Sequence, residues 1–253
     1  MQQKALAWRI EDVCFNSWPA LKEVFYAGWV ARFGEGLNRR TDSANPLQAE
    51  FGNIDAIVET CEVLYLSQGR QSVFRIPSLI DGAIEKRLLN SGYVPNLPSL
   101  VLYADIKDAA AEKNKDIILL TAPSPEWFEA MSILQNHTEQ EGATYRRIVG
   151  AIVIRAGYAI LRLDGQIAAL AYATLSDGLL CIESVITTPS FRGKGCGRRL
   201  LTYLIAWGKV NGAKGVCLQV AETNEAARTL YKNVGLKTSF YRYQYLCKPL
   251  SNE

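Results

Sequence analysis

The sequence of 253 residues predicts an α+β fold in which a mainly antiparallel sheet is flanked by helices. Three strand-like segments follow one another, at residues 158–163, 167–174 and 179–187. Asp164-Gly165, between the first two, is a typical hairpin turn. Helices then alternate with strands, at residues 194–210, 215–220, 224–234 and 239–247. An antiparallel meander followed by β–α–β–α–β order favours this fold class.

Local chemistry supports the other elements of this half of the chain. Residues 117–120 are apolar and predict a strand. Ser124 and Pro125 open a predicted helix over residues 125–134, because serine accepts hydrogen bonds from first-turn amides and proline suits the first helical position. A second helix is predicted over residues 139–149.

The first half of the chain shows weaker signals. The turn Gly34-Glu35-Gly36 lies between two strand-like segments and predicts a hairpin of residues 28–33 and 37–41. Downstream we expect a strand, a helix that ends near Gly92, and another strand, over residues 72–76, 79–90 and 99–104.

The composition is that of an ordinary globular protein, with 49% hydrophobic and 21% charged residues. A net charge of +3 does not indicate a nucleic-acid partner. The N-terminus lacks the apolar run of a signal peptide, and no apolar stretch is long enough to span a membrane. No Cys-x-x-C motif occurs, and the lone histidine, His137, is interpreted as a polar loop or cap residue. We therefore predict a cytoplasmic protein with reduced thiols, no metal and no membrane partner.

A glycine-rich segment is the most informative feature of the chain. Residues 191–201 place three glycines, at alternating positions, between a predicted strand and a predicted helix. Free backbone amides at a helix N-terminus bind phosphate oxygens, and four neighbouring side chains add positive charge: Arg192, Lys194, Arg198 and Arg199. The segment lacks the Lys-Ser/Thr of a P-loop, and Glu222 comes too late for the acidic residue of a dinucleotide fingerprint.

A second motif follows, over residues 224–236. Asn224 is the predicted cap of its helix and Gly235 the predicted end, while Ala227, Arg228 and Tyr231 share one helical face with Asn224. With the glycine-rich segment, this motif resembles the GNAT superfamily of acetyl-CoA-dependent N-acetyltransferases. It matches the pattern N-x-x-A-x-x-x-Y-x-x-x-G-[FL] at every position. The resemblance covers roughly residues 117–253 and implies a GNAT-like fold with acetyl-CoA as the acyl donor.

The resemblance also implies roles for individual residues. Tyr231 would be the general acid that protonates the CoA thiolate, and Glu183, which interrupts an apolar strand, is our candidate general base. A water chain or an amine of low pKa could replace Glu183. A backbone amide of the strand Val185-Ile186-Thr187 would polarise the thioester carbonyl. The expected acetyl-CoA site comprises Val185, Ile186, Thr187, Arg192, Gly193, Lys194, Gly195, Cys196, Gly197, Arg198, Asn224, Tyr231 and Lys232.

The first half of the chain is predicted to be a degenerate repeat of the second. Aligning Gly92 with Gly235 sets Asp81 against Asn224 and Leu88 against Tyr231, and no Gly-x-Gly-x-Gly occurs upstream. We therefore predict two domains: a degenerate GNAT-like or unassigned α/β domain over residues 1–108, and a catalytic domain over residues 117–253. The polar residues 109–116 would link them.

Several alternatives remain at this stage. The favoured function is transfer of an acetyl group to a primary amine by direct attack in a ternary complex, the acceptor being a small-molecule amine or a peptide N-terminus. A non-catalytic acyl-CoA-binding regulatory module is the alternative. An oxidoreductase that binds NAD(P) is a third, and a homodimer is possible.

Overall fold

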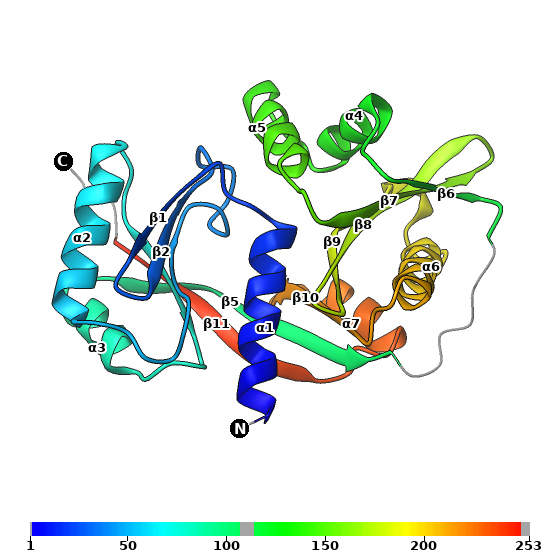
Figure 1. Ribbon diagram of the computed structural model, residues 1–253. Coiled ribbons are helices and arrows are strands. Elements are labelled where there is room, and N and C mark those ends of the chain that lie inside the picture. The colour runs from blue at the N-terminus through cyan, green and yellow to red at the C-terminus, as the bar shows by residue number, and fades with distance from the viewer. Residues whose placement is uncertain (1, 107–113, 249–253) are drawn as a thin grey trace.

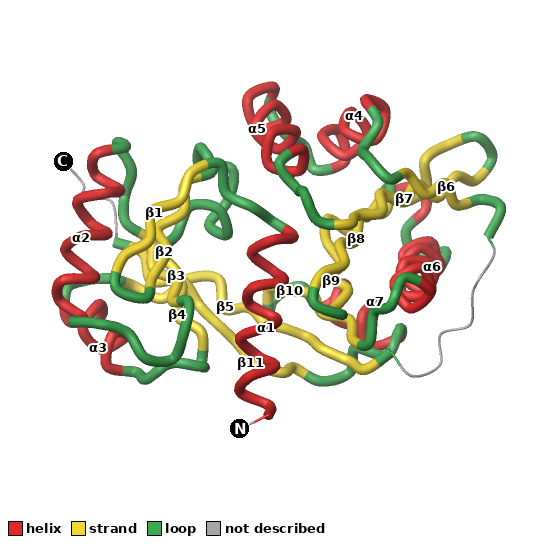
Figure 2. Tube along the Cα trace, in the orientation of Figure 1, coloured by secondary structure: helices red, strands yellow, loops and turns green. Residues whose placement is uncertain are grey.

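A computed structural model gives the fold of the chain, and it describes residues 2–106 and 114–248. Eleven strands form one sheet, in the order β1-β2-β3-β4-β11-β5-β10-β9-β8-β7-β6 (Figures 1 and 2). The strands are β1 Lys22–Tyr26, β2 Trp29–Phe33, β3 Ala44–Pro46, β4 Val73–Pro77, β5 Val94–Asp105, β6 Ile117–Leu120, β7 Arg155–Leu163, β8 Gln166–Ser176, β9 Leu179–Thr187, β10 Gly215–Ala221 and β11 Ser239–Cys247. The α-helices are α1 Gln2–Ser17, α2 Ile54–Ser67, α3 Ala83–Asn90, α4 Pro125–Leu134, α5 Glu139–Gly150, α6 Cys196–Val210 and α7 Glu225–Asn233. The fold is therefore the predicted α+β arrangement, with a mainly antiparallel sheet.

The two halves of the chain have the same order of strand pairings. In the first half, β1, β2 and β3 are antiparallel neighbours, and β3 is parallel to β4. In the second, β7, β8 and β9 are antiparallel, and β9 is parallel to β10. A helix and a final strand complete each half, α3 with β5 and α7 with β11. This correspondence agrees with the predicted repeat.

The final strands of the two halves are exchanged. β5, from the first half, pairs with β10, and β11, from the second half, pairs with β4. The two exchanged strands also pair with each other at the centre of the sheet. The hydrogen-bond ladder of each half therefore depends on a strand from the other. Part of the predicted linker, residues 109–113, lies outside the described residues, and the division into two domains stays a prediction.

Helices cover both faces of the sheet around β9 and β10. α6 and α7 share a core cluster with Leu180 of β9, whereas α1 packs against the next residue, Cys181, on the opposite face. α4 and α5 form a further cluster with β7 and β8. Figure 1 shows α1 crossing the middle of the molecule, beside the exchanged strands. Within the described residues, no helix has the length and apolar character needed to cross a bilayer.

Turns and caps in the second half follow the prediction. Asp164 and Gly165, both at positive φ, join β7 to β8 in the expected hairpin. The side chain of Ser124 caps α4. Thr138, rather than the adjacent His137, caps α5 through a capping box with Glu141.

The predicted hairpin of residues 28–33 and 37–41 is wrong in its second strand. β2 pairs instead with β1, which lies upstream. The sequence did not predict β1, α1 or α2. Residues 37–41 form turns, because side chains satisfy the backbone there. Asp42 accepts hydrogen bonds from the amides of Gly34 and Gly36, and Asn38 accepts from those of Arg40 and Thr41.

The exchange predicts that neither half folds stably alone. A fragment of residues 117–253 would expose the edge of β10 that β5 covers along seven residue pairs, so we expect it to aggregate. Co-expressed with a fragment of residues 1–116, it should form a soluble complex with the secondary structure of the intact chain, as measured by size-exclusion chromatography and circular dichroism. A soluble, cooperatively unfolding fragment of residues 117–253 alone would contradict this.

Candidate functional site

The central feature of the site is the separation of two parallel strands. β9 and β10 are paired only at Leu179–Gly215, Leu180–Val216 and Cys181–Cys217, although both strands continue. Beyond that point β10 follows β5, and β9 follows β8. A bulge in β9, where Ser184 has a φ of 52°, accompanies the separation. The C-terminal ends of β9 and β10 therefore present backbone groups that have no partner across the gap.

Hydrogen bonding to β8 decides which backbone groups of β9 face the gap. The amide of Thr188 donates to the carbonyl of Ala168 on β8 at 3.0 Å. Because successive residues of a strand turn their backbone groups to opposite edges, Thr187 presents its N–H and C=O to the gap. Ile186 turns its N–H and C=O toward β8, opposite Leu170. Of the strand residues predicted to contact acetyl-CoA, the backbone of Ile186 is therefore already used in pairing with β8.

The glycine-rich segment lies at the end of β9 and leads into α6. Gly193 and Gly195 both have a φ of 74°, which a residue with a side chain rarely adopts, and a Cβ atom at either position would meet open space. Gly195 is the N-cap residue of α6 and offers no side-chain cap. Among the described residues, the amides of Cys196, Gly197 and Arg198 have no hydrogen-bond partner, so the start of α6 can receive an anion.

Positive charge surrounds these amides. Arg192, Lys194 and Arg198 are exposed, and no carboxylate of the described residues forms an ion pair with them. Arg192 also donates to the carbonyl of Thr187 at 3.3 Å, which ties the loop to the end of β9. Arg199, by contrast, is paired with Asp116 at 2.6 Å. Cys196 is buried, so it can contribute to this site only through its backbone.

Gly197 brings three elements together at the start of α6. A Cβ atom there would lie 3.0 Å from a methyl group of Leu230 on α7 and 3.4 Å from the hydroxyl of Thr187 on β9. The lack of a side chain at this position thus allows α6, α7 and the end of β9 to meet around the gap.

Helix α7 supplies a buried tyrosine. Its first turn is capped by Asn224, which accepts a hydrogen bond from the amide of Ala227 at 3.1 Å, as predicted. Tyr231 lies on the inner face and is 8% exposed. Burial, aided by the negative charge of Glu183, raises the pKa of Tyr231 to about 12. Its phenol therefore stays protonated at neutral pH.

Lys232 does not join the glycine-rich segment. Leu230 is the residue of α7 that faces Gly197, and Lys232 lies two positions further, on another side of the helix. There it lines a separate cavity, with Arg228 and with Leu100 and Leu102 of β5.

Glu183 is buried beside the point where β9 and β10 separate, and it is not free. Arg40 donates to its two carboxylate oxygens, at 2.6 and 2.7 Å, in a bidentate ion pair. Burial alone would lower the pKa of Arg40. The attraction and hydrogen bonds of Glu183 outweigh this effect and raise that pKa well above its ordinary value. The thiol of Cys181 also donates to Glu183, at 3.6 Å.

Arg40 belongs to the loop between β2 and β3, which docks on the second half of the chain. In this loop Glu35 accepts from Thr144 of α5 at 3.0 Å and is paired with Arg147. Within the first half, Arg39 donates to Asn96 of the exchanged strand β5 at 2.7 Å. Sequence reasoning missed this loop as part of the site. No local pattern marks it, because its partners lie far away along the chain.

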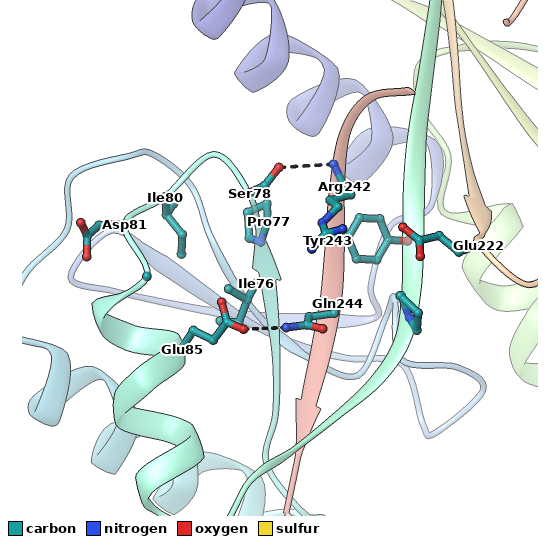
Figure 3. A pocket seen from close by; sticks show the side chains of 12 residues that line it. Ile76, Pro77, Ser78, Ile80, Asp81, Glu85, Glu222, Arg242, Tyr243 and Gln244 are labelled. Atoms are coloured by element: carbon teal, nitrogen blue, oxygen red, sulfur yellow. Dashed lines mark hydrogen bonds between the residues drawn. The ribbon is translucent and has the colours of Figure 1, made fainter. Parts of the chain in front are cut away.

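The first half carries acidic residues where the second half carries neutral or basic ones. With Gly92 aligned to Gly235, both at positive φ, Asp81 and Glu85 correspond to Asn224 and Arg228. Figure 3 shows these two acids beside a cavity of about 260 Å³ between α3 and β11, which also faces Glu222. Glu85 there accepts from Gln244 at 2.7 Å. Arg242 also lines this cavity, but the three carboxylates outnumber it and disfavour a polyphosphate.

The region around the gap thus combines three capacities. The start of α6 and its cations suit a phosphate, and the exposed backbone of Thr187 suits an extended ligand that pairs like a strand. Tyr231 adds a buried phenol on α7 that is neutral at physiological pH and can act as a proton donor. These capacities fit a long anionic ligand that reacts where β9 and β10 separate.

Comparison with known proteins gives a family. Residues 8–246 match the family model described as "Probable histone acetyltransferase Rv0428c C-terminal". The chain is also 24% identical over 231 residues to "Uncharacterized N-acetyltransferase YobR" of Bacillus subtilis (strain 168), which covers 90% of this chain and 93% of that protein.

Solved structures share the fold. A GCN5-related N-acetyltransferase from Kribbella flavida superposes with a TM-score of 0.73 at 18% identity, covering 96% of both chains. A tandem GNAT protein from the clavulanic acid biosynthesis pathway superposes with a TM-score of 0.62 at 14% identity, covering 83% of this chain and 76% of that one.

Proposed function

We propose that this chain, which belongs to the GNAT superfamily of N-acetyltransferases, moves an acetyl group from acetyl-CoA to a primary amine. The transfer would take place within a ternary complex. The observation that carries the proposal is the gap between β9 and β10, which ends at the unpaired amides of α6. Transfer of an acetyl group requires an anchored donor, a polarised carbonyl, an amine that loses a proton and a thiolate that gains one.

Acetyl-CoA as a substrate matches the chemistry of this region. The backbone of residues 192–198 would hold its pyrophosphate, helped by Arg192, Lys194 and Arg198. The exposed backbone of Thr187 would pair with the amide groups of the pantetheine arm, and its N–H is our candidate for the donor to the thioester oxygen. Asn224 acts by shaping the first turn of α7, because its side chain is already used as the cap.

Tyr231 is proposed as the general acid for the leaving thiolate. An acid must be protonated to act, and a pKa of about 12 keeps this phenol neutral throughout the physiological range. Burial places it in a site of low dielectric, where a proton donor stabilises a developing thiolate more strongly than it would in water.

Glu183 is proposed to position the site rather than to act as the base that we expected from the sequence. It could take a proton only by giving up its buried ion pair with Arg40, which costs several kcal/mol in general. The ion pair fixes the bulged part of β9 and joins it to the β2–β3 loop. The amine would then lose its proton to water.

The acceptor is proposed to approach from the side of the β2–β3 loop, as a small-molecule amine or a peptide N-terminus. This loop and Arg40 lie beside Glu183, on the face of the sheet opposite α6. A panel of amines, assayed by the release of free CoA thiol, tests the activity. Acetyl-CoA binding without turnover on any amine would instead favour a regulatory module. That the chain forms a homodimer, and that it lies in the cytoplasm, both stay predictions.

Gly195→Glu tests the anchoring of acetyl-CoA. The new carboxylate would compete with the pyrophosphate for the amides at the start of α6 and would repel it, so we expect binding to weaken by about 100-fold or more. The dissociation constant is measured by isothermal titration calorimetry. Gly165→Glu is the matched control, because Gly165 has a φ of 76°, also faces open space and lies in the β7–β8 turn. Equal weakening in both variants would contradict the assignment.

Tyr231→Phe tests the acid. We expect kcat to fall by about 10²–10⁴-fold with little change in acetyl-CoA affinity, because the hydroxyl acts on the leaving group. The wild-type rate should not fall with the ordinary tyrosine pKa, near 10, since activity that needs the neutral phenol is lost only as the pH rises through about 12. Tyr203→Phe, on α6 in the same core cluster, is the control. An unchanged kcat would rule out this role.

Glu183→Gln separates a positioning residue from a base. Glutamine keeps the size and one acceptor oxygen, so we expect a loss of kcat smaller than the roughly 10²–10⁴-fold that removal of a base causes, with the same pH profile as the wild type. Steady-state kinetics between pH 6 and about 9 provide the measurement, a range that spans the titration of most bases active near neutral pH. A large loss at neutral pH that diminishes as the pH rises would restore Glu183 as the base.

A further inference from the structure

Three cysteines that are far apart in the sequence converge in the core. Cys14 comes from α1, Cys181 from β9 and Cys217 from β10, and their sulfur atoms all lie within 4.8 Å of one another. All three are buried, and none forms a disulfide. Their separation along the chain explains why no motif predicted the cluster.

The cluster lies where β9 and β10 begin to separate. Cys181 and Cys217 face each other in the last pair before the strands diverge, and α1 places Cys14 over them. The other fully buried cysteines differ from these. Cys61 and Cys196 lie singly in separate apolar clusters, as cysteines that merely fill space do.

The geometry suits a tetrahedral thiolate site. Zinc–sulfur bonds of about 2.3 Å place two thiolates of a tetrahedron about 3.8 Å apart. The sulfur atoms of Cys14 and Cys181 are 3.9 Å apart. An oxygen of Glu183 lies 3.6 Å from the sulfur of Cys181, but no carboxylate of the described residues lies within 4.8 Å of all three sulfur atoms. The cluster therefore offers three protein ligands.

Three arginines lie near the cluster. Cys14 lines a small cavity with Arg32, Arg40 and Arg75. Each is already paired with a carboxylate, Arg32 with Glu23, Arg40 with Glu183 and Arg75 with Glu11. The Zn²⁺ ion itself would therefore offset most of the negative charge that the thiolates bring to this buried site.

We propose that the thiolates of Cys14, Cys181 and Cys217 bind a Zn²⁺ ion. The three thiols would release their protons on binding, and the ion would fasten α1 to β9 and β10 where these strands begin to separate. All three ligands are buried, so the metal is out of reach of a substrate and takes no part in acetyl transfer. This inference does not depend on the proposed function.

The test uses the full chain under reducing conditions. Because the cysteines are buried, the protein is unfolded with a chelator, freed of metal and refolded with or without ZnCl₂. We expect one zinc per chain by elemental analysis, and X-ray absorption at the zinc edge should show three sulfur neighbours at about 2.3 Å. The zinc-loaded protein should also melt at a higher temperature than the metal-free protein, because the ion binds only the folded state.

Cys14→Ala and Cys61→Ala form a matched pair, since both remove a buried thiol from a helix. Cys14→Ala should lose the stoichiometric zinc in the presence of a competing chelator, while Cys61→Ala should retain it; circular dichroism confirms that each is folded. The X-ray absorption of the wild-type protein needs no variant, should Cys14→Ala fail to fold. The proposal is overturned by a wild-type chain that binds no zinc when it is refolded with ZnCl₂, by a zinc shell of only nitrogen and oxygen, or by equal zinc retention in the two variants.

Discussion

The site depends on one constraint: β10 cannot stay hydrogen-bonded to both of its neighbours, β5 and β9, along its whole length. It is paired with β5 along its whole length and with β9 over only three residue pairs, while β9 stays paired with β8 on both sides of a bulge. β9 has a bulge at Ser184, whose hydroxyl accepts a hydrogen bond from that of Tyr145 on α5 at 3.0 Å. This bond ties the bulged part of β9 to α5. The gap that results leaves the backbone N–H of Thr187 without a partner on β8 or β10, while its carbonyl accepts from Arg192. The chemistry proposed for the chain follows from this divergence.

The exchange of final strands gives the first half of the chain a direct part in that constraint. β5 is the strand that draws β10 away from β9, and the β2–β3 loop carries Arg40 to Glu183. A second buried ion pair, between Glu11 of α1 and Arg75 of β4, lies within the first half and fixes α1, the helix that packs on Cys181 and Cys217 of the second half. Because a buried charge without its partner is strongly destabilising, these pairs allow few alternative arrangements of the two halves.

The two halves show how one pattern of strand pairing supports different chemistry. β3 and β4 are parallel and paired at a single position. β9 and β10, the corresponding strands of the second half, are also parallel and are paired at three positions. Yet α2 starts with a side-chain cap from Asn53, whereas α6 starts with open amides and glycines at positive φ. Leu88 occupies the position of Tyr231 and is fully buried. The first half thus keeps the architecture, but it has neither the open helix start nor the buried tyrosine found at these positions in the second half.

The sequence by itself determined the features that depend on neighbouring residues. Glycines at positive φ before α6, the Asn224 cap and the Asp164-Gly165 turn are local preferences of the backbone, so they were predicted correctly, together with the fold class. Only the tertiary structure decided the partner of Glu183, the position of Lys232 and the meeting of Cys14 with Cys181 and Cys217. Each of these depends on strand order and register between segments far apart in the chain. Hydrophobic periodicity places a residue on a face of the sheet, but it does not specify which distant segment will lie beside it.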